Sequence, residues 1–206
     1  MDARCGAQAP QRASIFPPLF DKRVLRKKEN SVLSSTSRFI LANFFTPSYR
    51  ILGRVQVGNS GLIGLMNDPN TSSIEVTQVS LARLQEPKVI TERVNEIRLV
   101  KRAILLIGLG RENEVGPSVV ARAGYGRVDR HRVRGISGTF EVRGDVEWAG
   151  RFDLATLLLE GGDFLPIYDA TLQAIQYPDL RMRSPAVLFN RRKMDILSLS
   201  TDEPEE

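Results

Sequence analysis

The sequence has very little of the chemistry on which most small catalytic and metal sites depend. Its 206 residues include one cysteine, Cys5, and one histidine, His131. A single cysteine excludes an internal disulfide, and one histidine with one cysteine cannot supply the clustered ligands of a zinc site. We therefore expect no metal, no cofactor and a reducing, cytoplasmic location.

Long apolar runs are also lacking. The longest, residues 103–109, has the length of a strand, whereas a membrane-spanning helix needs about 20 apolar residues. Residues 1–38 do not contain the apolar segment of a secretory signal. The composition, 42% hydrophobic and 26% charged, is typical of a globular chain with a packed core. We expect no membrane span.

Positive charge is concentrated outside the apolar segments. Residues 1–38 hold eight Lys and Arg against three acids, and residues 110–135 are rich in Gly and Arg. We interpret residues 1–38 as a basic, poorly ordered arm, with an organellar address as the alternative. Residues 110–135 are then a linker, with the alternative that residues 130–140 lengthen the first strand of the second repeat, and residues 200–206 are an acidic tail. The net charge of +5 describes these appendages more than a folded surface.

The chain resembles itself at a displacement of 91 residues. "YRILGRVQV" at 49–57 falls on "FEVRGDVEW" at 140–148, with apolar residues at the same alternate positions and Gly53 on Gly144. After a slip of one residue the displacement is 90, and the basic pairs Lys101-Arg102 and Arg191-Arg192 coincide. This pattern predicts an internal duplication, with β-repeat 1 at 39–109 and β-repeat 2 at 136–199.

Each repeat reads as a strand, a short helix or loop, a second strand, and two short strands. Alternating apolar residues predict the strands, and the tight polar turns at 100–102 and 190–192 predict hairpins. Residues 36–46 are a strand or short helix that covers an edge of the first repeat. The predicted fold is mainly β, with two tandem copies of a small antiparallel sheet or partly open barrel, each with a short helix or loop insertion.

This unit resembles Sm-like small barrels and duplicated bacterial β-domains of unknown role. The resemblance is carried by Gly53 and Gly144, by the strands that follow them, and by the basic turns. It implies a bent antiparallel sheet. The Sm-like signature also has an Asp and an Asn flanking an apolar strand. Neither copy has that pair at matched positions, so ring assembly and binding of uridine-rich RNA are not carried over.

Catalytic motifs are incomplete. "GLGRENEVG" at 108–116 lacks the third glycine of a dinucleotide fingerprint, and "GNSGLIG" at 58–64 lacks the Lys-Ser/Thr of a phosphate loop. His131 falls in the predicted linker, where we expect it to be solvated. Asp163 and Asp169 are the best paired carboxylates, but on one strand they lie about 20 Å apart. We expect Asp163 to end a turn and Asp169 to face solvent or to pair with an arginine.

Basic residues are the polar feature that both repeats share. They are candidates for contacts with a phosphate or an acidic partner, and charge for solubility alone is the alternative. The candidates are Lys101, Arg102, Arg191, Arg192 and Lys193 in the turns, and Arg130, Arg132 and Arg134 in the linker.

The sequence thus favours a non-enzymatic protein that acts in binding, scaffolding or regulation. A protein partner or self-association is expected because a small sheet leaves edge strands. The alternative is a nucleic-acid-binding protein that uses the basic arm, linker and hairpin turns on RNA or DNA. An enzyme is the third hypothesis.

Overall fold

The chain folds mainly into β-strands, as the alternation predicts. The structure is a computed structural model that describes residues 37–117, 127–159 and 161–200. The elements of the first half are β1 (Arg38–Phe45), β2 (Tyr49–Val57), α1 (Gly61–Met66), β3 (Ser73–Arg83), β4 (Ile90–Val100), the 3₁₀ turn η2 (Lys101–Ala103) and β5 (Leu106–Leu109).

A second half repeats this order of elements. After the 3₁₀ turn η3 (Glu112–Glu114) come β6 (Asp129–Ile136), β7 (Phe140–Trp148), α3 (Leu154–Leu159), β8 (Phe164–Ala174), β9 (Arg181–Asn190), the 3₁₀ turn η4 (Arg191–Lys193) and β10 (Ile196–Leu199). The bounds of β1, β2 and β3 recur in β6, β7 and β8 at a displacement of 91, and those of β5 recur in β10 at 90.

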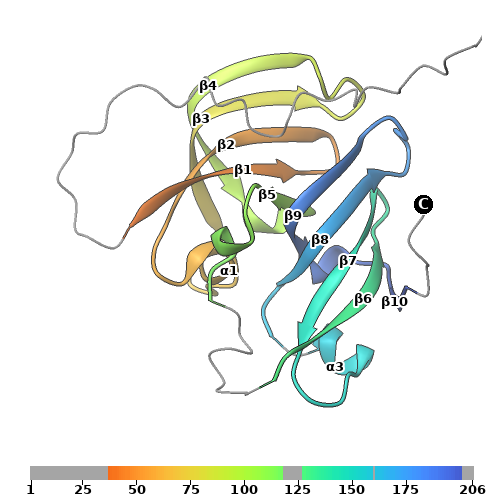
Figure 1. Ribbon diagram of the computed structural model, residues 1–206. Helices are drawn as coiled ribbons and strands as arrows, with labels where there is room; N and C mark the ends of the chain where they lie inside the picture. Colours follow the sequence, from red (N-terminus) through yellow and green to blue (C-terminus); the bar gives the residue numbers. More distant parts are fainter. Residues whose placement is uncertain (1–36, 118–126, 160, 201–206) are drawn as a thin grey trace, which may run out of the picture. The chain divides into compact units, whose positions relative to one another are not determined.

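All ten described strands join in one open antiparallel sheet (Figure 1). Their order is β10-β6-β7-β8-β9-β5-β1-β2-β3-β4. The first half contributes β5-β1-β2-β3-β4 and the second contributes β10-β6-β7-β8-β9, so the strands follow the same order in both halves. The two halves meet where β5 pairs with β9. Consequently β10 and β4 form the two free ends of the sheet.

The core lies where the predicted alternation places it. In β2, Ile51, Val55 and Val57 are buried, and in β7, Val142 and Val146 are buried. Removing each such side chain from water contributes about 1.5–3 kcal/mol. The core of the first half continues into the second, where it includes the following residues of β8 and β9: Phe164, Tyr168, Ala186 and Leu188.

Both halves bend at a matched bulge. The register of β2 with β3 shifts beside Gly53, and that of β7 with β8 shifts beside Gly144. The partner strands each hold one residue at positive φ, Gln78 at 52° and Asp169 at 46°. A Cβ on Gly144 would overlap the carbonyl oxygen of Tyr168. Glycine is needed here because the bulge brings the neighbouring backbone too close for any side chain.

The predicted hairpins at the basic turns are wrong. Among the described strands, β4 pairs only with β3, whereas β5 pairs with β1 and β9. η2 therefore does not fold β4 back on β5; it carries the chain from one edge of the five-strand half to the other. η4 does the same between β9 and β10. A polar turn between two apolar segments looks alike in both cases, because the pairing of strands is not a local property.

Four other predicted segments either differ from the structure or lie mostly outside the described residues. Residues 129–135, predicted as the end of the linker, belong to β6, which pairs with β7 as β1 pairs with β2. Residues 38–45 form β1, which lies inside the sheet between β5 and β2 and does not cover an edge. The predicted arm at 1–38 and tail at 200–206 lie almost wholly outside the described residues.

The bulge gives a test of the fold. Replacing Gly144 by alanine places a methyl group against the backbone of β8, and we expect it to lower the free energy of unfolding by about 1–3 kcal/mol. Gly58→Ala is the matched control, because a Cβ there meets no heavy atom within 4 Å, and its effect should stay within about 0.5 kcal/mol. Urea titration of both variants measures the difference, and equal midpoints would contradict the bulge geometry.

Candidate functional site

Lys101 is a structural residue inside the fold. Its side chain is buried, and its ammonium donates hydrogen bonds to the carbonyl oxygens of Leu65 (2.6 Å) and Asp68 (2.9 Å) and to Oγ1 of Thr71 (2.6 Å). Burial lowers the pKa of Lys101, and the carboxylates of Asp68 and Asp163 oppose that shift. The ammonium thus ties η2 to α1 and to the segment between α1 and β3, and it is not presented to a ligand.

Arg191 and Arg192 are both engaged by the segment before β8. The amide of Arg191 donates to the carbonyl oxygen of Asp163 at 2.7 Å, and Nε of Arg192 lies 2.7 Å from Oδ1 of the same residue. Burial lowers the pKa of Arg191, and Asp163 opposes this shift. Arg102 and Lys193, the remaining members of the two turns, are exposed.

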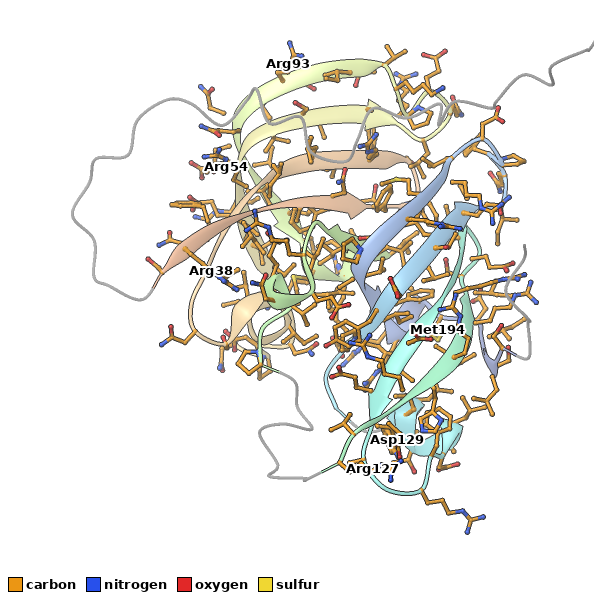
Figure 2. The ribbon with its side chains drawn as sticks, viewed as in Figure 1. Arg38, Arg54, Arg93, Arg127, Asp129 and Met194 are labelled. Atoms are coloured by element: carbon orange, nitrogen blue, oxygen red, sulfur yellow. The ribbon has the colours of Figure 1, made fainter. Side chains whose placement is uncertain are left out.

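The three arginines predicted to lie in a linker form part of an ordered charge ladder on β6. They occupy alternate positions and share one face of the strand, and each forms an ion pair with an acid on β7. The pairs are Arg130 with Glu147 (3.5 Å), Arg132 with Asp145 (3.2 Å) and Arg134 with Glu141 (2.7 Å). Their charge is therefore compensated within the protein. At the start of β6, Arg127 and Asp129 form a further ion pair, at 3.2 Å, within the same segment of the chain (Figure 2).

Arg130 contacts two carboxylates and an aromatic ring. Besides Glu147, it contacts Glu112 of η3 at 3.2 Å, and its guanidinium carbon lies 5.2 Å from the ring centroid of Tyr168. Burial would lower the pKa of Arg130, but the two carboxylates raise it. Burial, reinforced by both carboxylates, raises the pKa of Tyr168 to about 12. The cluster thus holds one guanidinium and two carboxylates together beside the tyrosine ring.

The two aspartates do not form an acid–base pair. Asp163 ends a turn and pairs with Arg192. Asp169 is exposed at the left-handed position of the β8 bulge. Across the described ranges, no group of three or more His, Cys, Asp or Glu residues is arranged to hold a metal ion. A hollow of about 230 Å³ is lined by residues at the ends of β2 and β3 and in the turns beside them, including Tyr49, Arg83 and Tyr177; its lining has no carboxylate or imidazole.

His131 is not the solvated linker residue that the sequence indicates. It lies on β6 opposite Val146, and its ring stacks on Phe152 with 4.2 Å between centroids. Trp148 packs edge-on against Phe152 at 5.9 Å. His131 therefore contributes to a small aromatic cluster beside α3. Its sequence neighbours Arg130 and Arg132 are charged, so the local sequence gives no signal for this placement.

The most extensive set of unpaired backbone groups in the described sheet lies on β4. This strand has 11 residues and only Leu99 is buried. The amide of Lys101 donates to the carbonyl oxygen of Ser72 across the β3 side. Because bonding directions alternate along an antiparallel strand, the amides of Val100, Arg98 and Glu96 point away from β3 toward the open edge. Arg93 projects from the same strand into solvent (Figure 2).

The opposite end of the sheet is β10. It has four residues, and Ile196 and Leu199 are 54% and 50% exposed. The amide of Ser200 donates to Arg132 of β6. By the same alternation, the amides of Leu197 and Leu199 point away from β6. β10 therefore presents both unpaired backbone groups and apolar side chains.

The joint between β5 and β9 shows how an edge strand of one half pairs with an edge strand of the other. β5 pairs with β9 over four residues, all of which are buried on β5. Beyond them, Asn190 donates from its amide to Leu105 O (2.9 Å) and from Nδ2 to Ile104 O (2.8 Å). Oγ of Ser184 accepts from the Leu109 amide at 3.1 Å. Edge pairing in this protein is thus a short backbone ladder with buried side chains around it.

Comparison of the chain with protein-family models, with curated proteins and with solved structures found no match. Among the described residues, no helix is long and apolar enough to cross a membrane.

The role of Lys101 is testable by substitution. Lys101→Met removes the donor to three oxygens that lie around it, and leaving such acceptors unsatisfied destabilises a fold by about 1–3 kcal/mol. Arg102→Met, at the exposed next position, should change the free energy of unfolding by about 0.5 kcal/mol or less. Thermal and urea unfolding measure both, and equal effects would place Lys101 at the surface.

The charge ladder predicts a pH dependence. Hydrogen bonds from Arg134 and then Arg143 lower the pKa of Glu141 below its ordinary 4.5, although burial opposes them. A lowered folded-state pKa stabilises the protein above 4.5 and ceases to do so as pH falls through the lowered value. Glu141→Gln should therefore reduce stability at pH 7 by about 0.2–1 kcal/mol. Urea titrations at several pH values should show the difference vanishing in acid; a constant difference would contradict the ion pair.

Proposed function

We propose that the protein is a non-enzymatic binding or scaffolding protein of the cytoplasm, built from two copies of one β module, and that it captures a partner's strand at an open edge of its sheet. The observation that carries this proposal is the open side of β4. There, nine of the 11 residues pair with β3, no other described strand pairs with β4, and by the alternation of an antiparallel strand every second amide points outward. Strand addition at such an edge is a common mode of protein recognition.

The joint between β5 and β9 supports the same mode of action. β9 corresponds to β4 in the order of elements, and it accepts a four-residue strand on the side that β4 leaves open. The fold therefore tolerates an added strand at this position without loss of its own pairing. Charged side chains on β4, including Glu92, Arg93 and Glu96, disfavour indiscriminate pairing. A partner must then match this edge in both shape and charge.

Nucleic-acid binding is less well supported by the described residues. Six of its eight candidate side chains are buried or held by acids of the fold, which leaves Arg102 and Lys193 in the described turns. Affinity for RNA or DNA carried by phosphate contacts falls steeply with added salt. Tight, salt-sensitive binding of a uridine homopolymer or of duplex DNA by the full chain would favour this alternative.

The edge proposal is tested by blocking one amide. Arg98→Pro removes an outward amide from β4, a change that edge strands tolerate, and Arg98→Ala removes the same side chain but keeps the amide. Tagged full chains are expressed in the source cells, crosslinked and recovered. We expect a defined set of proteins with wild type and Arg98→Ala, and at least a tenfold loss with Arg98→Pro.

Glu96→Pro and Glu96→Ala repeat the comparison at a second outward amide. Matching circular dichroism spectra and melting temperatures show that the variants are folded. If both proline variants recover the same proteins as their alanine controls, β4 is not the binding edge and the proposal is wrong.

A further inference from the structure

We infer that the partner of the open β4 edge is β10 of a second copy of this chain, joined head to tail in the register of the internal joint. This inference rests on the function proposed above, and it identifies the partner of that site. It is carried by two correspondences and one observed pairing. β10 corresponds to β5 and β4 corresponds to β9, and β5 pairs with β9 within the chain.

The positions of the two edges specify a register. In the internal joint, Leu106 pairs with Phe189 and Ile107 with Leu188. A displacement of +90 carries β5 onto β10, and one of −90 carries β9 onto β4. The same ladder between copies therefore pairs Ile196 with Leu99, Leu197 with Arg98, Ser198 with Ile97 and Leu199 with Glu96.

The directions of the backbone groups agree with this register. In the internal joint the amide of Asn190 points across to Leu105, so the amides that lie two and four residues before it on β9 point the same way. Their counterparts on β4 are Val100, Arg98 and Glu96, the amides that point away from β3. On β10, the amides of Leu197 and Leu199 point outward, and in this register they lie opposite Arg98 and Glu96. After a slip of one residue, the outward amides of one strand would no longer lie opposite the outward backbone groups of the other.

The apolar side chains of β10 are exposed because no described strand pairs with β10 on the side away from β6. β5 lies between β1 and β9, and all four of its residues are buried. The corresponding residues of β10 include Ile196 and Leu199, about half exposed, because the described chain covers only the β6 side. A second copy at this edge would cover them, as β9 covers β5.

The intermolecular joint is weaker than the internal one. Arg98 and Glu96 stand where β9 has Leu188 and Ala186, and Val94 and Val100 stand where it has Ser184 and Asn190. The side-chain hydrogen bonds made by Ser184 and Asn190 have no counterpart on β4. Association is therefore reversible, so it depends on protein concentration. Because the two edges differ, it forms a closed ring or an open chain, according to the rotation at each joint.

The test measures the mass of the full chain by sedimentation velocity and light scattering over a range of concentrations. The chain has a mass of 23.0 kDa, and wild type should reach two or more times this mass. Leu197→Pro blocks β10 and Arg98→Pro blocks β4, so each alone should be monomeric. Their alanine counterparts keep the amides and should assemble like wild type.

Mixing the two proline variants tests the direction of pairing. Each retains one intact edge, so an equimolar mixture should form a dimer of twice 23.0 kDa and grow no further. Ile196→Lys with Leu199→Lys provides a second block of β10. Ile175→Lys is its control, because Ile175 is similarly exposed, at 49%, outside both edges.

Three outcomes would overturn the inference: a wild type that stays monomeric at the highest attainable concentration, an oligomer that survives both proline substitutions, or a mixture of the variants that forms no dimer. These outcomes are distinct from failure of the proposed function. A monomeric wild type whose capture of another protein still requires the Arg98 amide would retain the edge proposal and remove only the second copy as partner.

Discussion

The ladder between β5 and β9 is the interaction on which the rest of this architecture depends. Each half of the sheet has five strands and two edges, and the ladder consumes one edge of each half. It buries all of β5, and the core of the first half continues through it to Tyr168 and Leu188. Without it, buried amides and carbonyls of β5 would have no partner on that side, which a fold rarely tolerates.

Each half of the sheet combines a matched bulge with a chain that crosses from one edge to the other. η2 has to connect β4 at one edge with β5 at the other. The bulge at Gln78 opposite Gly53 increases the local twist of the sheet. The ammonium of Lys101 holds the crossing segment to α1 and to the loop after it.

The local part of this fold was predictable from the sequence, and the part that depends on distant contacts was not. Alternation in 49–57 and 140–148 predicts β2 and β7 with their inward faces, because side-chain period is a local property. The hairpin expected at Lys101 is wrong because local sequence does not reveal which strand pairs with which. Internal burial of a lysine was equally hidden, since lysines are almost always exposed.

The candidate site was predictable in part. Alternating Arg130, Arg132 and Arg134 are visible in the sequence, and so are acids at alternate positions of 141–147, but their pairing follows only once β6 is recognised as the neighbour of β7. Reading 110–135 as a linker separated the two sets. The basic composition was therefore assigned to a ligand, although in the described sheet much of that charge is balanced across a strand pair.

The two open edges are unlike each other, and this difference limits how copies can meet. β4 is long and charged, whereas β10 is short and carries exposed apolar residues. Two β10 strands from different copies would each lack the long neighbouring strand that β9 provides for β5. Two β4 strands from different copies would bring together two charged edges and would leave the exposed Ile196 and Leu199 of β10 uncovered. Pairing β4 with β10 avoids both problems. It sets the apolar side chains and outward amides of β10 against the edge of β4, and the corresponding edge of β9 already accepts such a strand within the same chain.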